Sequence, residues 1–478
     1  VWFGFMCKDL IHQDASFMAE AIRNGHTNSR ELISLHVDRY KNFNSKLNGI
    51  VTFAEDALEQ ASHADKELED GLIKGPLHGV PFTMKDVFDS AGIRTTRGSK
   101  LFSDRIPESD SEVVKRLKNA GGILIGKTNL PEFALAAETS SAIFDKGENP
   151  WVKGHTCGGS SGGEAICISS GLSPLGVGSD LGGSNRLPSH YCGVVGFKPT
   201  QGRIPLTGHW PEMITRYFHA GPIARSVRDI VSSYHILSGY NGLDQYALPI
   251  PTESKSMPDF NGMKVGWFDN EPYDPVDPQI RNVVETAVEA LELNHCTVEK
   301  ISVPIVDGLS PIDATYVLLA GEGVEYLNKY VRGNESELSE PISGLLSIER
   351  PDLDTFLKAS SVCDSYKYWF TDYFAKYDIL ICPTAPNLAP KHDSQNIVID
   401  GQEMPASHAA AITCTFGITG FPAISIPFGM ADNGLPIGIQ IVANHYNENT
   451  LFDIAYYLES IYEDREVCEK DTRWFMVE

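Results

Sequence analysis

The sequence predicts an α/β protein with a large, mixed and mostly parallel β-sheet, buried between helices on both faces. Two observations support this fold class. Short apolar runs alternate with longer amphipathic segments, and the apolar runs carry almost no charge. The chain has 478 residues, of which 42% are apolar and 21% charged, so it has ample material for a core. We divide it into a helical region at residues 1–70 and one α/β core at residues 71–478.

The N-terminal region shows apolar residues at the helical period of 3.6, for example Leu32, Ile33 and Val37. Gly75 and Pro76 interrupt this pattern. The next apolar run predicts a buried strand that ends at Lys85, an unusual place for a lysine. Helices are expected over residues 14–23, 28–40 and 55–69.

The rest of the chain continues the alternation. A helix is expected over residues 109–120, with Ser109 and Glu112 as a capping box and Gly121 at its end. Residues 330–375 are more helical and predict a peripheral insertion. Further strands are expected over 122–125, 263–268, 298–303, 378–382, 423–427 and 437–442, and further helices over 278–291 and 450–461.

Charge and cysteine content narrow the expected partners and compartment. The formal net charge is −24 and no group of five or more basic residues occurs, which argues against binding to nucleic acid or to an anionic membrane. The longest uncharged run, residues 409–430, is interrupted by prolines, so no membrane span is expected. Nine scattered cysteines without a CxxC pair favour reduced thiols in a cytoplasmic protein. No motif indicates a metal or another cofactor.

Two motif matches are rejected on context. Residues 121–128 fit the phosphate-loop pattern GxxxxGK[ST], but their variable positions are Ile-Leu-Ile, which predict a strand rather than a phosphate-binding loop. Residues 158–162 fit the GxSxG nucleophile elbow. That motif needs an apolar strand directly before it, and WVKGHT is a poor strand.

Two glycine-flanked serine clusters carry the chemistry. They are GGSSGG at 158–163 and GSDLGGSNR at 178–186. A serine among glycines, followed by N–H groups that can converge, supplies a hydroxyl nucleophile and an oxyanion hole together. This arrangement needs a base, and neither cluster contains a suitable one.

With Lys85 added to these serines, the sequence resembles the amidase signature family of Ser–cis-Ser–Lys hydrolases, and the resemblance covers roughly residues 12–462. The motifs that carry it are PLHGVPFTMKD (76–86), GKTNLPEFA (126–134), GGSSGG (158–163), GSDLGGSNRLP (178–188) and CGVVGFKPT (192–200).

The resemblance implies the amidase signature fold and a catalytic triad. Ser184 would be the nucleophile, and Ser160, after a cis peptide bond from Gly159, would link it to Lys85. Ser161, Asp180 and Arg186 would support the loop, the last two most simply as a structural ion pair. The oxyanion hole would comprise the N–H groups of Leu181, Gly182, Gly183 and Ser184.

Lysine acts as a base only when it is neutral, and its ordinary pKa near 10.4 keeps it charged at pH 7. Burial without a carboxylate partner lowers that pKa. Phe82 and Met84 could desolvate Lys85, whereas Asp86 would oppose the shift if it turned inward. Lys85 would then deprotonate Ser160 as Ser160 deprotonates Ser184, and the proton would return to the leaving nitrogen.

The substrate is less defined. Trp210, Met213, Tyr217 and Phe218 predict an apolar pocket wall. We expect a monomeric or homodimeric hydrolase of small or apolar amides, extending to carbamates (urethanes) and aryl esters. One alternative is the glutaminase component of a glutamine-dependent tRNA amidotransferase (its A subunit), which shares fold and triad but acts in a heterocomplex and passes ammonia to a partner. A non-catalytic binding protein is a third possibility, which the intact triad disfavours.

Overall fold

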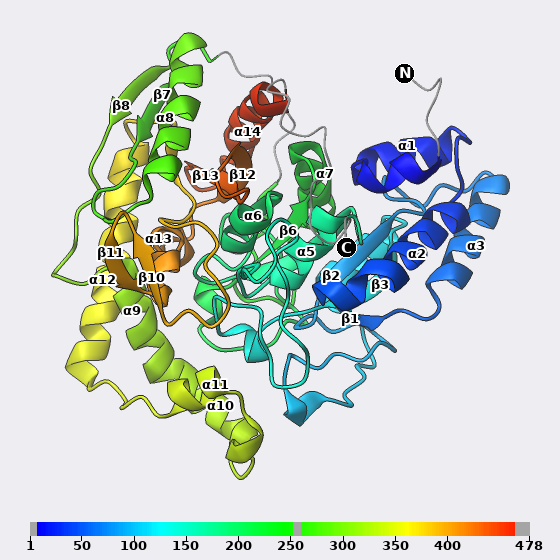
Figure 1. Cartoon of the computed structure of the whole chain (residues 1–478), viewed down its shortest axis with the longest axis horizontal. Coiled ribbons are helices and arrows are strands. Elements are labelled where there is room, and N and C mark those ends of the chain that lie inside the picture. The colour runs from blue at the N-terminus through cyan, green and yellow to red at the C-terminus, as the bar shows by residue number, and fades with distance from the viewer. Residues whose placement is uncertain (1–6, 252–259, 464–478) are drawn as a thin grey trace.

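The computed structural model describes residues 7–251 and 260–463 of the chain. Within these residues one sheet has eleven strands, and a separate hairpin has two (Figure 1). The strands of the large sheet are β1 (Ile50–Phe53), β2 (Pro81–Lys85), β3 (Ile123–Thr128), β4 (Leu175–Asp180), β5 (Val195–Lys198), β6 (His219–Ala224), β7 (Lys264–Trp267), β8 (Thr297–Lys300), β9 (Ile379–Pro383), β12 (Ala423–Met430) and β13 (Pro436–Ala443). The hairpin pairs β10 (Asn396–Ile399) with β11 (Gln402–Pro405).

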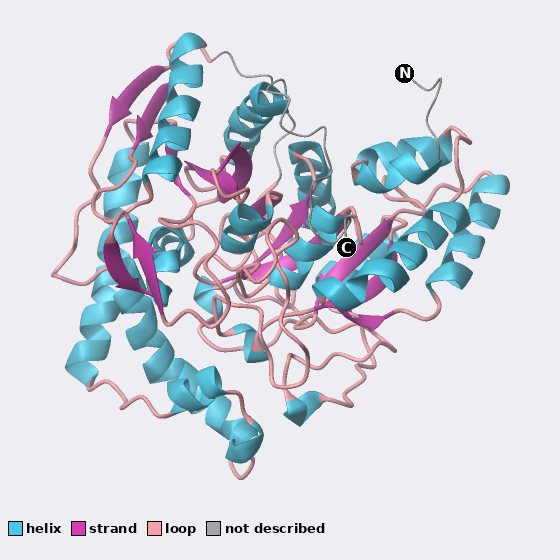
Figure 2. Cartoon of the chain, in the orientation of Figure 1, coloured by secondary structure: helices cyan, strands magenta, loops and turns pink. Residues whose placement is uncertain are grey.

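Helices precede, separate and follow these strands, as Figure 2 shows. The α-helices are α1 (Ala15–Arg23), α2 (Ser29–Leu47), α3 (Ala57–Glu69), α4 (Glu112–Asn119), α5 (Gly162–Ser170), α6 (Arg186–Cys192), α7 (Val227–Leu237), α8 (Pro278–Leu293), α9 (Pro311–Leu318), α10 (Val324–Val331), α11 (Glu340–Leu346), α12 (Leu353–Phe374), α13 (Ala411–Thr419) and α14 (Glu448–Glu463).

The strands of the large sheet lie in the order β1-β3-β2-β4-β6-β5-β12-β13-β9-β7-β8. Parallel pairing occurs in two blocks, β3-β2-β4 and β9-β7-β8. Antiparallel pairs join these blocks through β6, β5, β12 and β13, and add β1 at one edge. The large mixed sheet of an α/β fold is therefore confirmed.

The two faces of the sheet have different partners because side chains alternate along a strand. On β2, Phe82 and Met84 point into the main hydrophobic core, together with Leu117 of α4. Thr83 and Lys85 point to the opposite face, where Thr83 donates a hydrogen bond to Glu164 of α5. The face that carries Lys85 is thus the face covered by α5.

Glycines of β4 allow the close approach on this face. A Cβ at Gly176 would lie 1.8 Å from Glu164 Oε2, and one at Gly178 would lie 2.5 Å from Ser161 Oγ. Any larger residue would push α5 and the loop before it away from the sheet. The glycines of β4 therefore set the distance between the serine loops and the sheet.

A second hydrophobic cluster fills the other end of the molecule, where Figure 1 shows α9 and α12. It joins α9, α12 and α13 to the segment around Trp210. The segment 330–375 contains the end of α10 and all of α11 and α12, so its predicted helical character is confirmed. Its description as a peripheral insertion, like the division at residue 70, stays a prediction.

Three sequence-based details differ in the structure or are settled by it. The prediction of a capping box formed by Ser109 and Glu112 is wrong. The helix α4 begins at Glu112, its N-cap residue is Ser111, and the N-cap makes no side-chain hydrogen bond. The strand β1 lies in the region predicted to be helical, and it pairs with β3. Residues 123–128 of the GxxxxGK[ST] match form β3, which confirms that the variable positions are a strand and no phosphate loop.

No helix in the described part of the chain is long and apolar enough to cross a membrane. The cysteines that are free in the structure are all buried. They are Cys157, Cys167, Cys192, Cys296, Cys363, Cys382 and Cys414.

Candidate active site

Lys85 is the last residue of β2 and is fully buried. Its Nζ donates hydrogen bonds to Ser160 Oγ at 2.8 Å and to the Oγ and carbonyl oxygen of Ser179 at 3.1 Å each. Burial lowers the pKa of Lys85 from 10.5 to about 7, against the opposing charges of Asp180 and Glu164. A substantial fraction of Lys85 is therefore neutral near pH 7 and able to accept a proton.

Ser160 lies in the loop that leads into α5, and its preceding peptide bond with Gly159 is cis, as the resemblance implied. This loop packs tightly on residues 136–138. A Cβ at Gly159 would lie 2.7 Å from the carbonyl oxygen of Ala136. The segment after Phe133 thus holds the loop that presents Ser160 to Lys85.

Ser184 lies between β4 and α6 and is half-buried, unlike the buried Lys85 and Ser160. Its carbonyl oxygen accepts a hydrogen bond from the N–H of Ser161 at 3.0 Å, which ties the two serine loops together. Ser161 Oγ in turn donates to Asn185 Oδ1 at 2.9 Å. Lys85 therefore contacts Ser160 directly, and Ser184 is tied to the loop of Ser160 through its backbone carbonyl oxygen.

The backbone around Ser184 supplies N–H groups for a negatively charged oxygen. The predicted set needs one correction, because the N–H of Gly183 already donates to Asp180 Oδ1 at 2.7 Å. The N–H groups of Leu181, Gly182 and Ser184 donate to no acceptor within residues 7–251 and 260–463. These three remain the candidate oxyanion-hole donors.

Asp180 and Arg186 form a fully buried ion pair beneath this turn. Arg186 donates to Asp180 through Nε at 2.9 Å and Nη2 at 2.8 Å, and through Nη1 to Gln440 at 2.7 Å. Asp180 also accepts from the N–H of Asn185 at 3.1 Å. The Arg186 charge keeps the pKa of Asp180 well below its usual range, despite burial. Asp180 thus bonds to the backbone N–H groups of Gly183 and Asn185 in the Ser184 turn, while Arg186 holds Asp180 in place and also donates to the carbonyl of Thr413 at 3.0 Å.

We expect Asp180→Asn to lower the free energy of unfolding by about 3–5 kcal/mol, because it leaves the Arg186 charge buried without a counter-charge. Urea unfolding at pH 7 measures this. The exposed pair of Lys376 and Asp372, 2.7 Å apart, gives the control, since Lys376→Met should change stability by less than about 1 kcal/mol. Equal small losses in both variants would contradict the bracing role of Asp180.

Glu164 is a buried acid on the same face. Its carboxyl group accepts hydrogen bonds from Thr83 at 2.6 Å and from Thr128 at 2.9 Å. Burial raises the pKa of Glu164 to about 8. Near pH 7 most of this carboxyl group is protonated, which limits its ability to hold Lys85 in the charged form.

Asp86 does not oppose the neutral form of Lys85 in the way the sequence left open. Its carboxylate accepts from the N–H of Thr96 at 2.8 Å and from the Thr96 hydroxyl at 2.6 Å. A second buried lysine, Lys127, lies 3.5 Å from Asp86 Oδ1. Asp86 therefore belongs to a separate buried group and leaves Lys85 without a carboxylate partner.

The four residues of the predicted pocket wall are all buried in the second hydrophobic cluster. Trp210 directly follows His209 in the chain, and the ring centre of Phe218 lies 5.1 Å from that of His209, whose pKa is lowered to about 3 by burial and by the charges of Lys85 and Arg97. Met213 instead lies near Gly323, and Tyr217 lies beside Lys367 of α12. The structure thus brings Trp210 and Phe218 near the lysine side of the site, and their contact with substrate stays a prediction.

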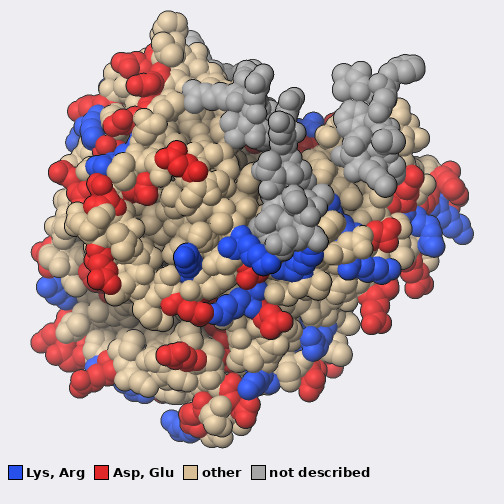
Figure 3. All heavy atoms as spheres, in the orientation of Figure 1, with Lys and Arg blue, Asp and Glu red and all other residues tan. Residues whose placement is uncertain are grey.

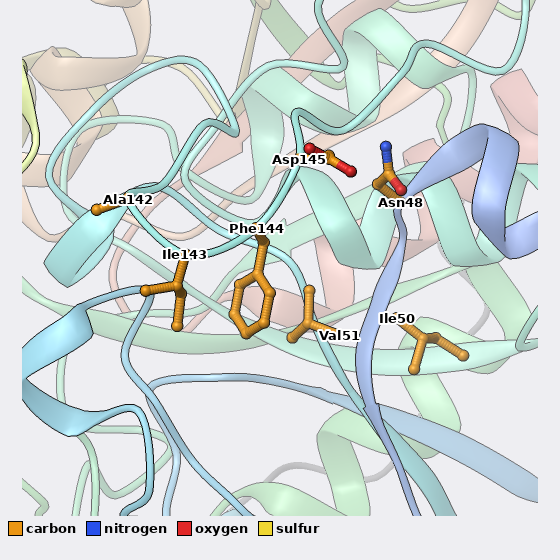
Figure 4. A pocket seen from close by; sticks show the side chains of 7 residues that line it. All are labelled: Asn48, Ile50, Val51, Ala142, Ile143, Phe144 and Asp145. Carbon is orange, nitrogen blue, oxygen red and sulfur yellow. The ribbon is translucent and has the colours of Figure 1, made fainter.

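A separate hollow of about 450 Å³ lies beside β1, the edge strand of the large sheet (Figure 4). Its lining comes from β1 and the loop 142–145, with Phe144 and Val51 facing each other and Asp145 near Asn48. None of the predicted site residues lines it. The described residues contain no group of three or more His, Cys, Asp or Glu side chains that could hold a metal ion.

Sequence reasoning missed Ser179, which supplies two of the three acceptors of Lys85. Its position within the motif GSD, at the end of the strand β4, was a signal that went unused. It also missed Glu164, although a charged residue inside the small-residue segment after GGSSGG is conspicuous.

Comparison with known proteins agrees with this geometry. The profile of the Amidase family matches residues 31–452, so the chain belongs to the amidase family. It is 32% identical over 460 residues to the A subunit of the glutamyl-tRNA(Gln) amidotransferase of Alkaliphilus metalliredigens, covering 90% of this chain and 92% of that one. The corresponding protein of Prochlorococcus marinus is 33% identical over 482 residues, covering 94% and 98%.

A solved structure also shares the fold. The crystal structure of an amidase superposes with a TM-score of 0.82 at 25% identity, covering 94% of this chain and 100% of that one. Fold and family therefore support an amidase-type enzyme.

These relatives overturn two predictions. The prediction of a hydrolase for small or apolar amides, carbamates and aryl esters is wrong, and its amidotransferase alternative is supported instead. The expectation of a monomer or homodimer without nucleic acid is wrong as well, because the relatives are each one component of an enzyme for glutamyl-tRNA(Gln). Apolar residues in one loop said little about the substrate, since they pack against the helices of the second cluster.

Proposed function

We propose that this chain is the amide-cleaving component of a glutamine-dependent amidotransferase. The supporting observation is the contact of 2.8 Å between the buried Lys85 Nζ and Ser160 Oγ, in a chain that aligns nearly end to end with the amidotransferase relatives. In this role the chain cleaves the side-chain amide of glutamine and releases ammonia to a partner protein.

The proposed reaction begins with neutral Lys85 accepting the proton of Ser160, while Ser160 accepts that of Ser184. The Ser184 oxygen bonds to the amide carbon, and the carbonyl electron pair moves onto its oxygen, which the N–H groups of Leu181, Gly182 and Ser184 stabilise. The proton returns along the same residues to the nitrogen, the C–N bond breaks and ammonia leaves. Water then attacks the ester on Ser184, giving glutamate and the free enzyme.

In this proposal a partner protein makes the main contacts with tRNA. On the face shown in Figure 3, basic side chains form short groups among acidic ones rather than one continuous track. With a net charge of −24, the chain is poorly suited to neutralise many phosphates by itself. We therefore assign the main contacts with tRNA to another member of the assembly.

The test is ammonia release from glutamine by the purified chain, alone and with its co-expressed partner proteins. We expect glutamate and ammonia in equal amounts, and faster release in the complete assembly. Asparagine and a neutral aliphatic amide serve as competing substrates. Efficient cleavage of neutral amides without cleavage of glutamine, in the assembly as well as alone, would refute the proposal.

A further inference from the structure

Arg97 is a buried cation with no ion-pair partner among the described residues. It is 8% exposed, and its guanidinium carbon lies 4.5 Å from the ring centre of Phe102 and 4.6 Å from that of Trp210. Its side chain donates no hydrogen bond within residues 7–251 and 260–463, and its Nε is completely enclosed. Asp89, whose charge reaches Arg97, is held by two hydrogen bonds of 2.7 Å from Arg105. A guanidinium buried in this way is costly unless an anion from outside the chain pairs with it.

Two neighbouring side chains have unused nitrogen atoms as well. His209 Nε2 and Trp210 Nε1 are buried and have no hydrogen-bond partner among the described residues. His209 is 3% exposed and Trp210 is 5% exposed, and the Trp210 ring is the one against which Arg97 stacks. Because buried polar groups are nearly always paired, unpaired nitrogen atoms on Arg97, on the Trp210 ring against which it stacks and on the preceding residue His209 point to a missing acceptor.

This group adjoins the candidate active site through the backbone. The N–H of Arg97 donates to the carbonyl of Asp86 at 3.1 Å, and Asp86 directly follows Lys85. The carbonyl of Arg97 accepts from the N–H of Phe133 at 2.9 Å, where the segment that packs on Gly159 begins. Arg97 therefore lies between the strand end that carries Lys85 and the loop that carries Ser160.

We propose that Arg97, His209 and Trp210 form a subsite for the carboxylate group of an amide substrate. The inference rests on the proposed function, in which glutamine brings an α-carboxylate into the site. The planar guanidinium suits a carboxylate because it can donate two parallel hydrogen bonds. The indole N–H and a neutral imidazole N–H can donate to the remaining oxygen lone pairs. The flanking rings of Phe102 and Trp210 keep water away and strengthen the pairing.

The experiment compares two amides of nearly equal shape, glutaramate with a free carboxylate and pentanamide without one, beside glutamine. We expect the wild-type assembly to have a higher kcat/KM for glutaramate than for pentanamide. Arg97→Met should lower this ratio by about 100-fold, the loss expected when a buried charge pair is broken. Arg97→Lys keeps the charge but not the planar guanidinium group, so its ratio should lie between those of the wild type and Arg97→Met.

Arg94→Met provides the matched control. Arg94 lies three residues before Arg97 and also sits over an aromatic ring, with its guanidinium carbon 5.8 Å from the centre of Phe144. Its loss should leave the ratio of the two amides unchanged. Thermal unfolding shows whether Arg97→Met folds. If it does not fold, the ratio in Arg97→Lys and the competitive inhibition of the wild type by glutarate test whether the subsite binds a carboxylate.

The outcomes separate this inference from the proposed function. Preference for glutaramate that depends on Arg97, without turnover of glutamine, would keep the subsite and refute the glutaminase proposal. Turnover of glutamine with an unchanged ratio in folded Arg97→Met would refute the subsite alone. A wild type that does not distinguish the two amides and is not inhibited by glutarate would refute it as well.

Discussion

Ser184→Ala is expected to reduce amide cleavage by at least about 10⁴-fold, the scale of loss seen when a nucleophile is removed from an acyl-transfer enzyme. The hydroxyl that forms the covalent bond disappears, while Lys85 and Ser160 keep their contact. Because Ser184 is half-buried and its neighbours are buried, the change creates little empty space in the core. Turnover of glutamine and covalent labelling by a fluorophosphonate probe are the two measurements.

The labelling experiment needs a serine control. Ser347 is exposed, and its hydroxyl donates to the carbonyl of Ser343 at 2.7 Å. Ser347→Ala should label as the wild type does, whereas Ser184→Ala should not label at all. Labelling of folded Ser184→Ala at full stoichiometry would assign the nucleophile to another residue.

The sequence was most informative where motifs are long and local. Strands β2 and β3 follow from short apolar runs, although β3 extends to Thr128, beyond the expected end at residue 125. The serine loops follow from their glycines. The assignment of Ser184, Ser160 and Lys85 to one site came from resemblance, because residues 75 and 24 positions apart cannot be joined by periodicity. The contact of Lys85 with Ser160 then gives this assignment a geometric basis.

What the sequence could not provide depends on pairing across the fold. Strand β1 has only four residues and follows a long helix, so its apolar pattern is too short to separate from helix. Nothing local shows that Asp89 pairs with Arg105 and leaves Arg97 without an anion. The occupied N–H of Gly183 is likewise visible only once Asp180 has been placed beside it.

Lys85→Met should abolish amide cleavage and at the same time stabilise the protein. Methionine has nearly the same length and brings no charge that burial would penalise, but it cannot carry a proton. In the wild type the rate should rise about tenfold per pH unit below pH 7 and level off above it, because the pKa of Lys85 lies at about 7 and only the neutral amine accepts a proton. In Lys85→Met the rate of ester cleavage should fall much less than the rate of amide cleavage, because the leaving group of an ester needs no protonation. Equal losses for both substrate classes would contradict the proposed proton transfer.

The same lysine makes stability depend on pH. Its pKa is about 7 when folded and 10.5 ordinarily, so the unfolded chain binds more protons between these values and stability rises with pH across that window. At about 1.4 kcal/mol per pKa unit the full effect is about 5 kcal/mol, and below pH 7 the folded protein bears all of this cost. Urea unfolding from pH 6 to 10 should show the free energy of unfolding of the wild type rising relative to that of Lys85→Met. Both proteins contain Glu164, so its titration is common to the two curves. Parallel curves for the two proteins would mean that Lys85 stays charged in the fold, and the base for Ser160 would then have to be sought elsewhere.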